Sequence, residues 1–190
     1  MTRCAPALAI AFAVGCGGGV VASSPASSPP QGPVPSLPAT IAVQATAALV
    51  DLGNTRIGTV SFADTPAGLL VIGSVSGLGI GVHGLHLHTV GACDPPFASA
   101  GGHFNPTGVK HGFRNPAGHH AGDMPNIVTP PSGTHGFQFI VDGVKLTGKA
   151  GLLDADGAAI VIHSSADDYL ADPSGNSGGR MACGVITLVK

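Results

Sequence analysis

The chain has 190 residues, a length that suits one domain with an extra segment at one end. Its 30 glycines, 16 prolines and lack of tryptophan, with only 9% charged residues, favour a β-rich domain over a helical one. The formal net charge is −2, and only eight lysines and arginines are present, which excludes a basic patch for nucleic acid. No apolar run reaches the roughly 18 residues of a membrane-spanning helix.

The start of the chain has the pattern of an export signal. A short basic start that ends at Arg3 is followed by a largely apolar segment at 5–14. The sequence AVGC that ends at Cys16 resembles a bacterial lipoprotein cleavage site, which predicts a signal peptide over residues 1–15 and a lipid on Cys16. The alternative is an ordinary secretory signal that is cleaved near Ala22. Both readings predict export.

A linker separates this signal from the folded part of the chain. Residues 16–38 are mostly Gly, Ser, Pro and Ala, with almost no charge. Such a segment cannot bury enough apolar surface to offset its ordering entropy, so we expect a flexible tether. The folded domain is predicted at 39–190.

Short apolar segments separated by glycine-rich turns predict an antiparallel sandwich or barrel. The dipeptide Asp142-Gly143 predicts a hairpin between the segments on either side of it. Residues 91–127 and 164–179 are rich in turn-forming residues and are expected to be functional loops. The predicted strands are 41–50, 56–62, 69–75, 82–89, 134–141, 144–147, 158–163 and 185–189.

The predicted strand at 82–89 carries side chains that could bind metal. Alternation along a strand places His86 and His88 on one face and Leu85 and Leu87 on the other. One face can therefore enter a core while the other presents two imidazoles side by side. Seven of the nine histidines of the chain lie between residues 83 and 123.

This concentration of histidines predicts two metal sites. A set made only of imidazoles suits Cu(II), whereas three imidazoles with one carboxylate form a tetrahedral set for Zn(II). Asp123 is the only carboxylate between residues 103 and 123, so the site nearest to it should be the zinc site. The residues alone do not divide the histidines between the two sites.

The cysteines are consistent with export. Cys4 lies in the signal and Cys16 would carry the lipid, which leaves Cys93 and Cys183. One pair in an oxidising compartment predicts a disulfide. The alternative is a pair of free, buried thiols.

Six short motifs follow one another along the chain. They are HGLHLH at 83–88, SAGGHFNP at 99–106, HG at 111–112, H-x-G-D at 120–123, H-x-x-A-D at 163–167 and GGRMACGVI at 178–186. In order and in spacing, they resemble the signatures of the copper/zinc superoxide dismutase family. The resemblance covers roughly residues 39–190. The place of Cys93 close behind the histidine strand, together with the export signal, is similar to the bacterial exported branch, of periplasmic or lipoprotein type.

By position in these motifs, the resemblance implies the ligands of both metals. Copper would be bound by His86, His88, His103 and His163, and zinc by His103, His111, His120 and Asp123. His103 would thus bridge the metals as an imidazolate. Asp167 would join one ligand of each metal by hydrogen bonds. Arg180 would sit beside copper and dock the substrate anion.

The resemblance also implies a fold and an activity. The fold would be an all-β, Greek-key antiparallel barrel or sandwich, immunoglobulin-like, with eight strands and two long functional loops. The activity would be disproportionation of two superoxide ions to O₂ and H₂O₂, with one Cu²⁺ and one Zn²⁺ per subunit. Copper would cycle between Cu(II) and Cu(I), His103 and Arg180 would be catalytic, and zinc would be structural. The alternative is a non-catalytic copper- and zinc-binding module of the same fold.

The expected setting is the periplasm or cell envelope, in antioxidant defence. Superoxide is the predicted partner, nucleic acid is not, and contact with a membrane would occur only through the lipid on Cys16. The chain is expected to be a monomer or a homodimer.

Overall fold

The computed structural model describes residues 41–131 and 133–190, which belong to one compact unit of the chain, Gln31–Lys190. The predictions of a signal peptide at 1–15, a lipid on Cys16 and a tether at 16–38 lie outside the described residues. Within 41–131 and 133–190, no helix combines the length and the apolar character that are needed to span a bilayer.

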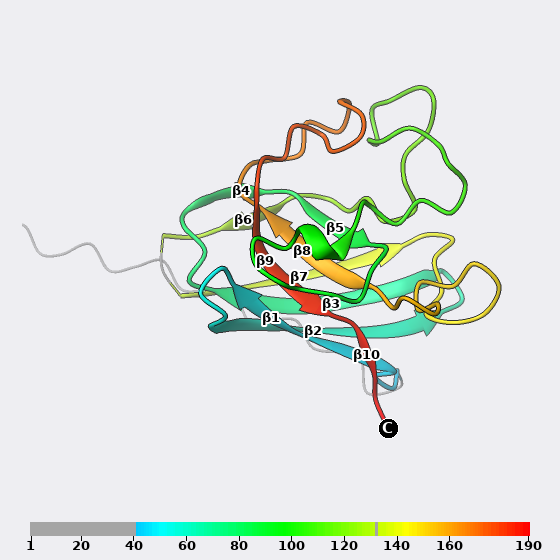
Figure 1. Ribbon diagram of the computed structural model, residues 1–190, viewed down its shortest axis with the longest axis horizontal. Helices are drawn as coiled ribbons and strands as arrows, with labels where there is room; N and C mark the ends of the chain where they lie inside the picture. The colour runs from blue at the N-terminus through cyan, green and yellow to red at the C-terminus, as the bar shows by residue number, and fades with distance from the viewer. Residues whose placement is uncertain (1–40, 132) are drawn as a thin grey trace, which may run out of the picture. The chain divides into compact units, whose positions relative to one another are not determined.

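Strands dominate the described part of the chain, which contains no α-helix and one short 3-10 helix (Figure 1). The all-β prediction is therefore confirmed. The elements are β1 (Ala45–Asp51), β2 (Arg56–Thr65), β3 (Gly68–Ser76), β4 (Gly81–His83), β5 (Leu85–His88), η1 (Ala98–Ala100), β6 (Ile127–Thr129), β7 (Thr134–Val141), β8 (Ala159–His163), β9 (Arg180–Val185) and β10 (Thr187–Leu188).

The main sheet has eight strands, and all of its neighbouring strands are antiparallel. Their order is β5-β8-β9-β1-β2-β3-β7, with β10 paired to β1, and β4 pairs with β6 in a separate two-stranded sheet. Strand β3 pairs with β7, and β5 pairs with β8, although other elements lie between them in the sequence. Segments far apart in the sequence therefore lie side by side. The antiparallel barrel or sandwich with eight strands is thus confirmed.

The strand prediction differs from the structure in several details, among them strand β6, which was not predicted. The predicted strand at 82–89 is interrupted at Gly84, whose N–H donates to the carbonyl of Ser165 instead of extending a ladder. Strand β9 was not predicted, because its sequence lacks a regular alternation. The segment 144–147 is not a strand: the backbone of Leu146 bonds to the carboxylate of Asp64 and to Leu153, while β7 pairs with β3.

The two faces of strand β8 pack in two different hydrophobic clusters. Ile160 and Ile162 point into the main hydrophobic core, whereas Val161 packs in a second, smaller cluster with Phe97 and Cys183. All five residues of β8 are buried. Since side chains alternate along a strand, His163 lies on the same face as Val161, away from the main core.

The two predicted functional loops lie on the same side of the sheet (Figure 1). Backbone bonds fasten them together: the N–H of Arg114 in the first loop donates to the carbonyl of Tyr169 in the second, at 2.8 Å. We call residues 103–123 the first loop and residues 164–179 the second loop. Together they cover the face of β5 and β8 that carries the histidines.

Candidate metal centre

Backbone hydrogen bonds return both ends of the first loop to strand β5. Leu87 accepts a bond from one end at 2.8 Å and donates to the other at 2.9 Å. His103 therefore pairs with His88, and Asp123 with His86, in isolated antiparallel bridges. The sheet thus fixes the ends of the loop, although the loop itself has no regular structure.

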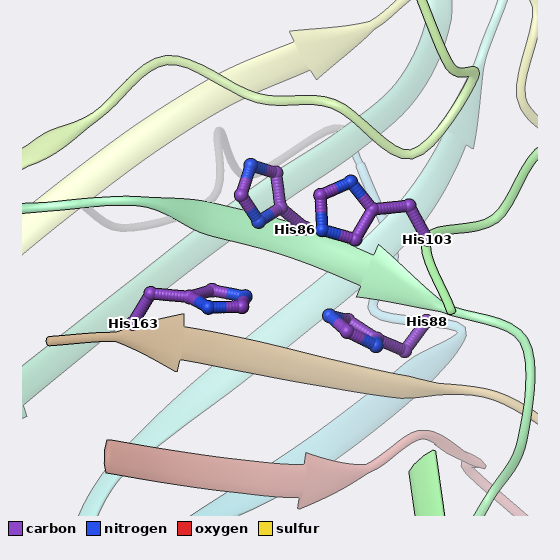
Figure 2. A group of neighbouring side chains, drawn as sticks. All are labelled: His86, His88, His103 and His163. Atoms are coloured by element: carbon purple, nitrogen blue, oxygen red, sulfur yellow. The ribbon is translucent and has the colours of Figure 1, made fainter. Parts of the chain in front are cut away.

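Four histidines converge on the outer face of the sheet (Figure 2). His86 and His88 project from β5, His163 from the end of β8, and His103 from the first loop. Each can offer one ring nitrogen such that all four atoms lie within 4.8 Å of one another. We call this set the four-histidine cluster.

The hydrogen bonds of these imidazoles leave particular nitrogens without a partner. His86 uses Nε2 to donate to Asp167, at 2.9 Å, and His88 uses Nδ1 to donate to the carbonyl of Gly101, at 3.0 Å. Across residues 41–131 and 133–190, the buried side-chain polar atoms that lack a hydrogen-bond partner are Nδ1 of His86, Nε2 of His88 and both nitrogens of His163. Buried orphan nitrogens are costly and require an explanation. A metal ion bound among them would provide it.

The pKa values agree with a metal-binding role for these imidazoles. Burial lowers the pKa of His86 to about 4, against the opposing hydrogen bond to Asp167. Burial, together with the charges of His86 and His103, lowers the pKa of His163 to about 3. Burial likewise holds the pKa of His88 well below its ordinary value. These rings are therefore neutral at physiological pH, and a neutral imidazole is the form that binds a metal.

A second set of ligand atoms gathers around the carboxylate of Asp123. Its Oδ1 lies 3.1 Å from Nδ1 of His103, 2.9 Å from Nδ1 of His111 and 3.4 Å from Nδ1 of His120. Its Oδ2 accepts hydrogen bonds from the N–H groups of Gly112 and His120. Although burial opposes ionisation, hydrogen bonds from His103, His111 and the N–H of Gly112 hold the pKa of Asp123 far below its ordinary value. Three imidazoles and one ionised carboxylate fit tetrahedral zinc.

Asp167 connects the two sets. Its Oδ2 accepts a bond from Nε2 of His86 and its Oδ1 accepts one from Nε2 of His111, at 2.9 and 3.0 Å. Burial opposes its charge, but the bonds from His111 and His86 hold the pKa of Asp167 well below its usual range. Asn126 clamps the backbone of Asp167, donating to its carbonyl at 2.9 Å and accepting from its N–H at 2.8 Å.

Raising the pH of the metal-free protein from about 6.5 to about 9.5 should lower its free energy of unfolding by about 2–3 kcal/mol. Burial opposes a charge on His111, but hydrogen bonds to Asp123 and Asp167 raise its pKa to about 9. The folded pKa exceeds the unfolded value of about 6.5, so this stabilisation is complete below the unfolded pKa. It is lost as pH rises through the folded pKa. Urea denaturation would measure it, and His111→Gln should remove the pH dependence.

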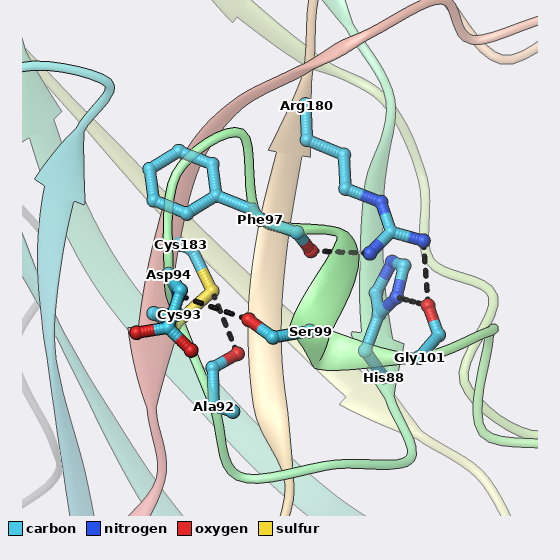
Figure 3. Close-up of a disulfide and its surroundings, with 9 residues drawn as sticks. All are labelled: His88, Ala92, Cys93, Asp94, Phe97, Ser99, Gly101, Arg180 and Cys183. Atoms are coloured by element: carbon cyan, nitrogen blue, oxygen red, sulfur yellow. Dashed lines mark hydrogen bonds between the residues drawn. A yellow bond between two sulfur atoms is a disulfide. The ribbon is translucent and has the colours of Figure 1, made fainter.

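Arg180 lies beside the four-histidine cluster. It stands directly across from His163 in the pairing of β9 with β8, where the register shifts by a bulge. Its guanidinium donates to the carbonyls of Phe97 and Gly101 (Figure 3). Gly101 also accepts the bond from His88, so one carbonyl positions both the cation and an imidazole. The guanidinium is partly exposed, as an anion-docking group must be.

A disulfide between Cys93 and Cys183 holds the segment that supplies these carbonyls. Figure 3 shows this bond tying the segment that leads into η1 to strand β9. Cys183 is fully buried and packs with Phe97 in the smaller hydrophobic cluster. The predicted disulfide is therefore present, and the alternative of two free thiols is wrong.

Asp172 fastens the second loop to the first. Its carboxylate accepts bonds from the N–H of His111 and from the ammonium of Lys110, both at 2.9 Å. It also lies 3.9 Å from Nε2 of His120. The side chain of Lys110 is 60% exposed, so its ion pair adds little stability. The charge of Lys110 is therefore opposed by Asp172 rather than left to attract an anion.

All of the predicted metal-binding residues lie in or beside these two sets. In the tight group around Asp123, the ligand atoms of His86, His103 and His111 fall within 4.8 Å of one another, and His120 stands just outside it. Of the remaining histidines, His83 bonds to the carbonyl of His163, and His119 bonds to the carbonyl of His120 and packs on Phe113. His135 lies on β7.

Sequence reasoning missed four residues that shape the centre. Phe97 and Gly101 act through backbone carbonyls, so their side chains carry no signal. Asn126 and Asp172 act through ordinary polar side chains at positions without a periodic pattern. The place of Asn126 three residues after Asp123 was the only available hint.

Comparison with known proteins gives consistent matches. A family model described as copper/zinc superoxide dismutase (SODC) matches residues 56–186. Cu-Zn superoxide dismutase 2 of Aquifex aeolicus is 45% identical over 148 residues, which cover 76% of this chain and 86% of that protein. Cu-Zn superoxide dismutase of Deinococcus radiodurans is 41% identical over 155 residues, covering 74% of this chain and 82% of that protein.

The solved structures show the same relationship. The crystal structure of a superoxide-dismutase-like protein from Bacillus subtilis is similar with a TM-score of 0.70 and 40% sequence identity. The match covers 73% of this chain and 95% of that one. With a family model that matches more than half of the chain, and with relatives of 41–45% identity that cover most of it, the chain belongs to the copper/zinc superoxide dismutase family.

Proposed function

We propose that the protein is a superoxide dismutase, which converts two superoxide anions and two protons into O₂ and H₂O₂. The observation that carries the proposal is the position of Arg180 across from His163, beside three buried imidazoles with unpartnered nitrogens. A redox metal held there would have a fixed positive charge next to it.

The two sets of ligand atoms support one copper and one zinc ion. Copper would be held by the four-histidine cluster, because an all-imidazole set suits Cu(II). Zinc would be held by His103, His111, His120 and Asp123. When bound, copper supplies one-electron oxidation and reduction, which no side chain of the cluster can perform. Zinc would hold ligands and order the first loop.

The residues around the metals would bind the substrate and supply protons. Arg180 would attract and orient superoxide, since its guanidinium is fixed by two carbonyls and lies next to His163. His103 belongs to both sets, and its Nδ1 faces Asp123, which leaves Nε2 for the four-histidine cluster. A proton at this Nε2 could supply one of the two that H₂O₂ requires. Asp167 would fix the orientation of His86 and His111.

Arg180→Ala should lower the second-order rate constant for superoxide decay by about 10- to 100-fold, because the variant loses the local charge that concentrates the anion. Pulse radiolysis of the metal-loaded protein would measure the constant. Arg180→Lys should keep part of the rate. Copper and zinc contents should match those of the wild type in both variants. Full activity in Arg180→Ala would contradict the assigned role, and an inactive, fully loaded wild type would refute the function itself.

The second candidate is a metal-binding module without catalysis. The relative from Bacillus subtilis is described as superoxide-dismutase-like, which concerns that protein and keeps the candidate open. The same assay separates the two functions, because a module would bind both metals and leave superoxide decay unchanged.

Export to the cell envelope is also proposed. The disulfide fits an oxidising compartment, and the first 16 residues have the pattern of a lipoprotein signal. In cells fed with a labelled fatty acid, the wild-type protein should carry the label and a Cys16→Ala variant should not. Equal labelling would refute lipidation at Cys16. The protein would act as a monomer or a homodimer.

A further inference from the structure

Gly175 is a buried position in an otherwise exposed stretch of the second loop. Its neighbours Ser174 and Asn176 are exposed, whereas Gly175 is buried and has a φ of +62°. The residue faces the link between the two metal-binding sets. A Cβ atom placed on Gly175 would lie 1.8 Å from Oδ1 of Asp167 and 2.6 Å from Nε2 of His111.

Neither of these atoms can move without breaking the link. Oδ1 of Asp167 accepts the bond from His111 at 3.0 Å and another from the N–H of Tyr169. Oδ2 of the same carboxylate is held by His86, and the whole side chain is buried. A rotation that cleared space for a methyl group would therefore remove a hydrogen bond from a histidine of each set.

Gly175 cannot easily shift away from Asp167 within the loop either. The N–H of Gly175 donates to the carbonyl of Ala171, and its carbonyl accepts from the N–H of Asp168. Asn126 holds the backbone of Asp167 by two further hydrogen bonds. The backbone of Asp167 is thus fixed, while its carboxylate lies against the bare backbone of Gly175.

We propose that Gly175 is a positioning residue, which locks the Asp167 carboxylate onto His86 and His111 and excludes water from this link. The inference rests on the proposed function only in its assignment of these histidines to metals. The absence of a side chain is what lets the second loop close over the carboxylate. The second loop therefore orients one imidazole ring in each set, those of His86 and His111, and it also covers both sets.

The first test compares Gly175→Ala with Gly143→Ala. Gly143 has a φ of +68°, and a Cβ placed on it meets no atom within 4 Å. Both variants therefore carry similar backbone strain, but only Gly175→Ala crowds Asp167. Zinc affinity, measured by competition with a chelator, should fall by about 10- to 100-fold in Gly175→Ala, as for other groups that support metal ligands. Gly143→Ala should keep the wild-type affinity.

A second measurement needs no metal. In the metal-free protein, the Nε2 protons of His86 and His111 are bonded to Asp167, so their exchange with water, observed by NMR, should be slow. Exchange should accelerate by about tenfold or more in Gly175→Ala, because each factor of ten corresponds to about 1.4 kcal/mol of lost protection, and it should stay slow in Gly143→Ala. Circular dichroism would verify that both variants fold.

An Asp167→Ala background determines whether Gly175 acts through Asp167. There the methyl group of Gly175→Ala has no carboxylate to displace, although it still crowds Nε2 of His111, so the further loss of zinc affinity should be smaller than in the wild-type background. A loss of equal size in both backgrounds would overturn the proposal, as would equal affinities and exchange rates in Gly175→Ala and Gly143→Ala. A wild type that binds both metals but leaves superoxide unchanged would refute the proposed enzyme and leave this inference intact.

Discussion

Replacing His163 with alanine should abolish copper binding in the four-histidine cluster and lower superoxide dismutation by at least about 100-fold. Loss of a group that merely supports a ligand already costs about 10- to 100-fold in affinity or activity, and His163 would be a ligand itself. It is the member of the cluster in which both nitrogens are buried without a hydrogen-bond partner. Its partner across the sheet is Arg180 on β9, a cation that would not take its place as a ligand.

The measurement combines metal analysis with pulse radiolysis of protein loaded with both metals. His135→Ala is the matched control, because His135 lies on β7, away from both sets, and should keep its copper and its rate. Zinc should remain bound in both variants, since His163 does not contact Asp123. If His163→Ala kept full activity, the copper assignment would be wrong.

Removing the disulfide should lower the free energy of unfolding by about 2–5 kcal/mol. Cys93 and Cys183 are 90 residues apart, so the bond closes a long loop and restricts the unfolded chain. The double variant Cys93→Ser/Cys183→Ser would be compared with the wild type by urea denaturation of the metal-free proteins. A metal-free comparison is needed because bound metal adds stability of its own.

The same variant should also lower the rate of dismutation. The carbonyls of Phe97 and Gly101 that fix Arg180 belong to the segment which the disulfide ties to β9. Without the bond, the guanidinium should lose its fixed position while both metals stay bound. Unchanged stability would show that packing of Phe97 alone holds this segment, and an unchanged rate would show that Arg180 needs no such support.

The sequence predicted the parts of the centre that depend on periodicity or on residue type. Alternation in the strand that contains His86 and His88 placed two imidazoles on one face, and the structure has them there on β5. The family resemblance then added His163 and Arg180 from distant strands. These two residues could not be joined to the cluster by spacing alone, because their proximity results from the pairing of β8 with β9 and the bulge within it.

The features of the centre that could not be predicted depend on backbone groups or on the absence of a side chain. Gly175 contributes by having no side chain, and Phe97 contributes through a carbonyl. The prediction of a hairpin at Asp142-Gly143 was wrong for the segment 144–147, which is not a strand. The turn forms, with Gly143 at a φ of +68°, but the N–H of Leu146 is bonded by Asp64 from another strand. A tertiary contact therefore replaced the local ladder.

The closed base of the first loop has a consequence for how this protein can evolve. The N–H of Gly122 donates to the carbonyl of Phe104 at 2.8 Å, and both ends are bonded to Leu87. The interior of the loop can therefore gain or lose residues without moving His103 at its root. A change in loop length would therefore affect His111 directly and would reach His86 on the sheet only through Asp167.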